Sequence, residues 1–348
     1  MIKNKPWGQL AQGDPLAWLL EEDIKDPGPR FFALRDLCDL PESHPEVAET
    51  RQAIMRYGPV PVILEAQEEE GYWVKPGPGY NPKYKATVWS VISLAQLGAD
   101  PSDERVRRAG GYLLSHASTK TGALSASGAP SGAIFCHSGN LIAALIDLGW
   151  QEDPRLEAAI EWLARVTTGE GMADAEDKKA SPRYYKSGAS GPTFECSANN
   201  KLPCAWGGIK AMNAFTRIPA GSRSSLVQQA IDVGVEFFFS RDPALADYPM
   251  GWSEKPSRNW WKFGYPIFYV SDMLEILEVL STLSYGGDKR LDAAYQLLID
   301  KQDQQGRWLL EYTYNGKTWI NVEEKGKPSK WVTLRALGAL KRRAEMVN

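Results

Sequence analysis

Helical segments of two kinds alternate along this chain of 348 residues. One kind is apolar on nearly every side, as in 141–146 and 273–283. The other carries one apolar stripe at the spacing i, i+3, i+4 and i+7, as in 156–163 and 291–298. A helix with one stripe has a solvent-exposed back, whereas a helix that is apolar all round is covered on every side. The alternation therefore predicts an all-α double ring, with an inner layer of helices wrapped by an outer one.

Turn signals predict where these helices begin, because Gly after the last apolar residue favours a helix end and Asp-Pro a helix start. Inner helices are expected to begin near Phe31, Lys85, Cys136, Cys204, Pro266 and Lys330. Outer helices are expected at 46–57, 104–117, 154–166, 223–239 and 289–301. We expect a single domain over 1–348, with 1–30 as an N-terminal closing segment. The long connections 168–200 and 240–265 are interpreted as lid-like loops, because loops of this length in compact folds are usually functional or disordered.

Two segments repeat the pattern Q-x3-G-x-W, at 67–73 and 302–308, and each ends a helical stretch. The pattern, followed at 87–90 by the start of an apolar helix, resembles the QW-type repeat of terpenoid cyclases and protein prenyltransferase β-subunits. The segment 325–334 is similar to bacterial prenyltransferase-like proteins of unassigned function. The resemblance covers roughly residues 60–345 and implies the (α/α)6 toroid; a fold of this kind hosts many chemistries.

The chain departs from these families at their catalytic motifs. The nearest string to the Asp-x-Asp-Asp motif of squalene–hopene-type cyclases is 174–177, which two lysines follow in a polar loop. A carboxyl that protonates an alkene needs a dry apolar site to stay protonated, so this string is expected to be an ordinary loop. The zinc ligands of the protein prenyltransferases have no matching Asp-x-Cys pair here and are not carried over.

Charge and cysteine content restrict the partners of the protein. Lys and Arg number 40 against 43 Asp and Glu, a net charge of −3, which argues against a nucleic-acid partner. No run of eighteen apolar residues is present, so no transmembrane segment is expected. Four cysteines and no secretory signal favour a reducing, cytoplasmic location. The oligomeric state is left open.

Three thiols are expected at one end of the inner ring. Cys136 and Cys204 open neighbouring inner helices, and Cys196 lies eight residues before Cys204. With His137 they form a predicted Cys3His set, which suits tetrahedral zinc as a cofactor. Two alternatives stay open: the thiols pack as small hydrophobic side chains, or Cys204 is a nucleophile with His137 as its base across the helix gap.

Aromatic and basic residues gather before the same helix starts and predict a substrate pocket for a small apolar or ring-bearing molecule. The predicted substrate-binding residues are Tyr84, Trp89, Trp206, Trp260, Trp261, Tyr265, Phe268, Trp331, Lys85 and Lys330. Asp272 stands in the first turns of an apolar helix, where a carboxylate needs a partner. It is interpreted as a catalytic acid, a metal ligand or a helix-terminal charge satisfied by backbone donors.

Three functions follow from these residues. The first is an enzyme that acts on an apolar or isoprenoid-like substrate inside the toroid, with a zinc-thiolate site near the inner-helix N-termini. The second is a hydrolase, either a cysteine- or metal-dependent acyl hydrolase or a glycan-active (α/α)6 enzyme, whose acid–base chemistry needs two carboxylates. The third is a non-catalytic binding toroid with a structural metal.

Overall fold

The computed structural model describes residues 6–173, 177–180 and 189–347. Within these residues, six helical segments form an inner ring: α2 (Gly28–Phe32) with its π-helical continuation η3 (Ala33–Leu37), α5 (Thr87–Gln96), α7 (Phe135–Asp147), α9 (Ala205–Thr216), α11 (Met273–Thr282) and α13 (Lys330–Val347). Outside them lie α1 (Pro15–Leu20), α3 (Pro45–Arg56), α4 (Pro59–Glu65), α6 (Glu104–Ala117), α8 (Pro154–Thr168), α10 (Ser225–Phe239) and α12 (Asp292–Asp300).

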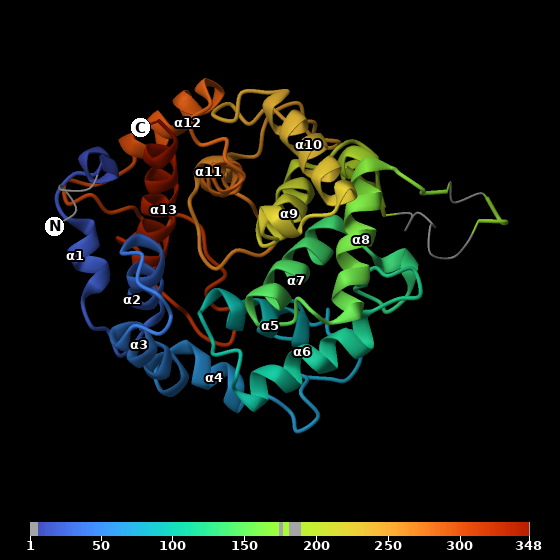
Figure 1. The fold of residues 1–348 in the computed structure, drawn as a ribbon, viewed down its shortest axis with the longest axis horizontal. Helices are drawn as coiled ribbons and strands as arrows, with labels where there is room; N and C mark the ends of the chain where they lie inside the picture. Colours follow the sequence, from blue (N-terminus) through green and yellow to red (C-terminus); the bar gives the residue numbers. More distant parts are fainter. Residues whose placement is uncertain (1–5, 174–176, 181–188, 348) are drawn as a thin grey trace.

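The helices close into a circle, with the outer helices along its rim (Figure 1). Each inner helix from α5 to α13 packs against the next one along the chain, and α13 packs against α2. The ring closes at Gly98, just after α5, where a Cβ atom would lie 3.3 Å from the Phe31 ring. The predicted all-α (α/α)6 toroid is confirmed by this arrangement, and each expected outer helix lies within three residues of its predicted bounds.

Several outer-layer helices begin with the same capping unit. Asp103 accepts a hydrogen bond from the backbone N–H of Arg105 and pairs with its guanidinium, and Asp153 does the same with Arg155. A third copy, at 288–290, precedes α12. A carboxylate at an N-cap satisfies backbone donors that the first helical turn leaves free. The Arg-bearing turns that recur in the sequence are therefore helix starts.

The two Q-x3-G-x-W repeats adopt the same structure. The Trp73 backbone N–H donates to Thr87 Oγ1 of α5 at 3.1 Å, and its indole N–H donates to the Ile63 carbonyl of α4 at 2.7 Å. Trp308 repeats this with Thr333 Oγ1 of α13 at 3.0 Å and with a carbonyl of α12 at 2.8 Å. Both indoles are fully buried. Each repeat thus fastens an outer helix to the following inner helix.

The two long connections touch each other. The first contains a two-residue antiparallel pair, β1 (Ser190–Gly191) with β2 (Glu195–Cys196). Asn199 then joins it to the second connection, since its side-chain amide donates to the Pro249 carbonyl at 3.1 Å and its oxygen accepts from Gly251 N–H at 2.9 Å. Part of 168–200 lies outside the described residues, as do 1–5 of the expected closing segment. Their roles as lid and closing segment stay predictions.

Candidate functional site

A cavity of about 740 Å³ lies inside the ring and is lined by residues of all six inner helical segments. It reaches the turns that follow these helices, at Gly98, Gly149 and Arg217. The cavity therefore extends to the C-terminal ends of the inner helices, whereas the sequence pattern predicts a site at their N-terminal ends. At the N-terminal end of α5, a later connection crosses the ring: the Trp319 indole N–H donates to the Lys85 carbonyl at 3.1 Å.

Aromatic side chains line one part of the cavity wall, and charged side chains line the rest. Four aromatic side chains form one part of it, Phe31, Phe32, Tyr265 and Trp331. The last two stack in parallel, with ring centroids 4.3 Å apart. The rest is strongly polar and contains five arginines and five carboxylates: Arg35, Arg51, Arg217, Arg335, Arg342, Asp36, Glu42, Asp147, Glu275 and Glu278. Aromatic faces beside paired charges and amides suit a ligand that has both a ring and polar groups.

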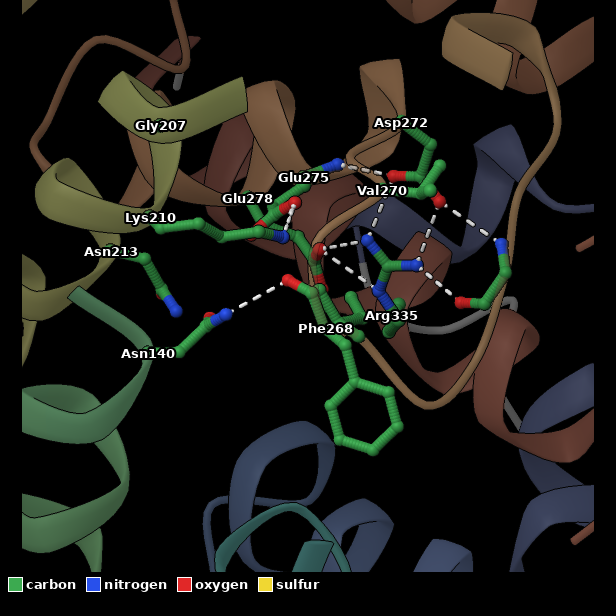
Figure 2. Close-up of polar contacts among 12 residues, drawn as sticks. Asn140, Gly207, Lys210, Asn213, Phe268, Val270, Asp272, Glu275, Glu278 and Arg335 are labelled. Atoms are coloured by element: carbon green, nitrogen blue, oxygen red, sulfur yellow. Dashed lines mark hydrogen bonds and ion pairs between the residues drawn. The ribbon is translucent and has the colours of Figure 1, made fainter. Parts of the chain in front are cut away.

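A buried ion pair joins two inner helices at the cavity wall. Lys210 of α9 donates from Nζ to Glu275 Oε1 of α11 at 2.7 Å (Figure 2), and both side chains are almost fully buried. Burial disfavours both charges, so it raises the pKa of Glu275 and lowers the pKa of Lys210 from their usual ranges. Each partner opposes this effect of burial, because the charge of Lys210 favours the ionised form of Glu275 and the reverse also holds.

A second carboxylate stands one helical turn further along α11. Glu278 Oε2 accepts from Arg335 Nη2 of α13 at 2.7 Å and lines the cavity. Residues three apart on a helix have Cβ atoms about 5–6 Å apart on the same face. Glu275 and Glu278 therefore present two carboxyl groups in different surroundings, one beside a buried amine and one fixed by a guanidinium.

Asp272, the predicted catalytic acid, is held by protein groups on every side. Its two oxygens accept from Arg335 at 3.0 Å each, from the backbone N–H of Glu275 at 2.8 Å and from that of Gly264 at 3.0 Å (Figure 2). It caps the N-terminus of α11 and does not line the cavity. Of the three interpretations of Asp272, the helix-terminal charge fits this geometry. Asp272 also orients the Arg335 guanidinium, which donates to Glu278.

The predicted substrate-binding aromatics fall into two groups. Tyr265 and Trp331 line the cavity. Tyr84, Trp89 and Phe268 instead pack against one another with ring centroids 5.2–5.7 Å apart. Trp206 packs against Trp260 at 6.2 Å, and the Trp261 indole donates to the Ala244 carbonyl. None of these last six lines the cavity.

The two predicted basic residues also lie away from the cavity. Lys85 stands over the Trp319 ring at 5.2 Å. Lys330 lies 3.6 Å from Asp23 and faces the Trp18 ring. Their predicted role, like that of the packed aromatics, remains a prediction.

Of the three thiols, those of Cys196 and Cys204 influence each other most strongly, and Cys136 lies near them. The interaction between Cys196 and Cys204 lowers the pKa of Cys196 to about 6 and raises that of Cys204. Cys204 sulfur also caps α9 by accepting from the Gly207 N–H at 3.4 Å. Burial raises the pKa of Cys136 to about 11, with Cys196 close enough to add to the shift.

His137, the predicted fourth zinc ligand and candidate base, lies apart from this thiol pair. Its ring meets the Tyr80 ring edge-on at 5.4 Å, and burial lowers its pKa to about 4. Among the described residues, no group of three or more His, Cys, Asp or Glu side chains is arranged to hold a metal ion. The predicted zinc set of Cys136, Cys196, Cys204 and His137 therefore has no support among the described residues and stays a prediction.

The charged residues of the cavity are absent from the predicted site. One signal was present in the sequence: Lys210 is the one charge in the segment 205–216, and Glu275 and Glu278 are the two charges in the segment 273–282, both of which are otherwise mostly apolar. Such a charge needs a buried partner. The sequence does not say which neighbouring helix supplies that partner.

Comparisons with known proteins give likeness at the level of architecture. No family model matches the chain, and no curated protein matches it. A variant of the type II terpene cyclase MstE from Scytonema, in complex with merosterolic acid A, has 16% identity over 92% of this chain and 88% of its own, with a TM-score of 0.46. An unsaturated glucuronyl hydrolase specific for heparin has 14% identity over 92% and 84%, with a TM-score of 0.49. At these values neither protein assigns a family or an activity to this chain.

Within the described residues, no helix combines the length and the apolar character needed to cross a bilayer.

Proposed function

We propose that the protein is an enzyme that performs acid–base chemistry on a ring-bearing, hydroxylated substrate in the central cavity, as a glycan-active toroid does. The observation that carries the proposal is the placement of two carboxyl groups, Glu275 and Glu278, in different surroundings on one cavity wall. Pairs of titratable groups in contrasting environments are the usual basis for dividing acid and base roles.

Glu275 is the proton-transferring residue in this proposal. Its carboxyl is raised in pKa by burial, and Lys210 holds it in place at 2.7 Å. In glycoside hydrolysis such a carboxyl protonates the leaving oxygen as the glycosidic C–O bond breaks; a water molecule then forms the new C–O bond and returns a proton to the carboxylate. Glu278, fixed by Arg335, places negative charge where positive charge develops on the sugar ring.

The charged wall favours this substrate class over an isoprenoid. A cavity that guides carbocations needs mainly apolar and aromatic walls, with charges kept away from the reactive chain. Here five arginines and five carboxylates line the cavity, and most of the predicted aromatics pack among themselves instead. Tyr265 and Trp331 stack on each other and are only 5% and 2% exposed, so they form a closed apolar boundary of the cavity beside the charged wall.

Turnover of two substrate panels tests the proposal: aryl glycosides and oligosaccharides on one side, geranylgeranyl-bearing acyclic compounds on the other. We expect hydrolysis only in the first panel, and a loss of kcat of about a hundredfold or more in Glu275→Gln. Glu236→Gln, an exposed position on α10, is the matched control and keeps full activity. Thermal unfolding shows whether each variant is folded. Absence of glycoside turnover in the wild type, or an unchanged kcat in folded Glu275→Gln, refutes the proposal.

A further inference from the structure

Among the residues that the structure describes, one guanidinium in the cavity differs from the others by lacking a carboxylate partner. Four of the five cavity arginines are paired with cavity acids: Arg35 with Asp36 at 2.5 Å, Arg51 with Glu42 at 3.0 Å, Arg217 with Asp147 at 3.2 Å and Arg335 with Glu278 at 2.7 Å. The remaining acid, Glu275, is paired with Lys210. Arg342 of α13 has no ion pair with any residue in the described part of the chain.

The geometry of Arg342 leaves its terminal nitrogens available to the cavity. Nε donates to Ser281 Oγ of α11 at 2.9 Å, which fixes the plane of the guanidinium. Nη1 and Nη2 lie beside Gly338, one turn earlier on α13, where an added Cβ atom would stand 3.4 and 3.6 Å from them. Within the described residues these two nitrogens have no hydrogen-bond acceptor, and the side chain is partly exposed at the cavity.

We infer that Arg342 binds an anionic group of the ligand, so that the substrate of the cavity is an acidic ring compound rather than a neutral one. The inference rests on the proposed function, because it concerns the same cavity. A guanidinium presents two parallel N–H donors that match the two oxygens of a carboxylate, sulfate or phosphate. The fixed Nε and the free terminal nitrogens of Arg342 are the arrangement that such a group requires.

Electrostatics around Arg342 supports the same conclusion. Burial lowers its pKa, so the surrounding protein disfavours the charge, and neighbouring Arg217 adds repulsion. Glu278 and Asp36 act in the opposite direction from a distance without forming an ion pair. An anion between Arg342 and Arg217 would supply the direct partner that the protein does not.

Matched sugars test the inference by isothermal titration. The probes are glucose, glucuronate, glucose 6-sulfate and glucose 6-phosphate, which share one ring and differ in the anionic group. We expect at least one acidic sugar to bind the wild type about tenfold or more tightly than glucose, as charge-assisted hydrogen bonds provide. The strongest of the three identifies the group. Equal affinity for all four sugars, or no binding of any, overturns the inference.

Three variants assign the preference to its residue. Arg342→Gln removes it, and Arg342→Lys keeps part of it, because the charge stays but the planar fork is lost. Arg343→Gln is the control, since Arg343 is the next residue but pairs with Asp292 at 2.8 Å, and it keeps the full preference. A preference that survives in Arg342→Gln, or that falls equally in Arg343→Gln, overturns the inference.

The two proposals fail separately. A preference that depends on Arg342 without any glycoside turnover leaves the anion site standing and refutes the enzymatic proposal. Turnover of neutral and acidic glycosides at equal kcat/KM, with both depending on Glu275, refutes the anion site and leaves the enzymatic proposal standing.

Discussion

The two ends of the inner ring of helices carry different kinds of side chain, aromatic at one end and charged at the other. At the N-terminal ends, Tyr84, Trp89, Phe268 and Tyr314 fill the space with rings whose centroids lie 4.7–5.7 Å apart. At the C-terminal ends, the same helices contribute arginines, carboxylates and amides to a cavity of about 740 Å³. One end is closed by side chains that contact only protein, and the other presents groups that a ligand can meet.

This difference separates stability from function along each helix. The aromatic end buries large apolar area and fixes the connections that cross it, so its residues act on the fold. The charged end removes ion pairs from bulk water, which contributes little or nothing to stability. Such an arrangement is retained only where polar groups are needed, which is the reason to place the chemistry at the charged end.

Trp89→Ala is the substitution with the largest expected effect on stability. The indole is 1% exposed, contacts four other aromatic rings and donates to the Tyr80 carbonyl at 2.8 Å. We expect its removal to lower the free energy of unfolding by about 3–5 kcal/mol in urea denaturation. Trp252→Ala is the control: its side chain is 72% exposed and its indole donates to the Ala198 carbonyl, so we expect a loss well below that of Trp89→Ala. Wild-type stability combined with lost ligand binding in Trp89→Ala would move the substrate site to the aromatic end.

The next largest effect concerns the buried pair at the charged end. Lys210→Met leaves the Glu275 carboxylate without its partner, and we expect a loss of roughly 3 kcal/mol. The double change Lys210→Met with Glu275→Leu removes both charges and should regain most of that loss, because buried ion pairs are often replaceable by apolar residues. Denaturation curves of the three proteins measure this. A double variant as unstable as the single one would show that the pair stabilises the fold, which would weaken the contrast between the two ends.

Most of the fold could be predicted from the sequence, because its signals are local. Stripes and fully apolar faces repeat at helical spacing, and Asp103 and Asp153 mark helix starts directly. The one inner helix placed poorly was expected near Pro266 but begins at Met273, after Asp272 as its N-cap. Residues 264–272 instead connect to other elements, as where Ile267 N–H donates to Gln96.

Much less of the candidate site could be predicted, because it depends on which helices become neighbours. The rule that a buried charge needs a partner was applied to Asp272 but applies equally to Lys210 and Glu275. Arg342 stands in a run of basic residues near the end of α13, which in sequence looks like an ordinary solvated turn. Arg342 lines the cavity only because the inner helices close into a ring.

The smallest expected effect lies at the border between the two ends, where Asp26 accepts from the Trp331 indole at 2.6 Å. Burial raises the pKa of Asp26 to about 8 from its usual 3.8. The folded protein therefore holds a proton that the unfolded chain releases between these values, so this group's contribution to stability is full below about pH 4 and falls as the pH rises to 8.

Asp26→Asn keeps an acceptor for the indole without the ionisation. We expect it to be more stable than the wild type by on the order of 2 kcal/mol at pH 7 and by little at pH 4. A stability difference that does not change with pH in thermal unfolding would mean that Asp26 is ionised in the folded protein, and that the charged end extends to the stacked pair of Tyr265 and Trp331.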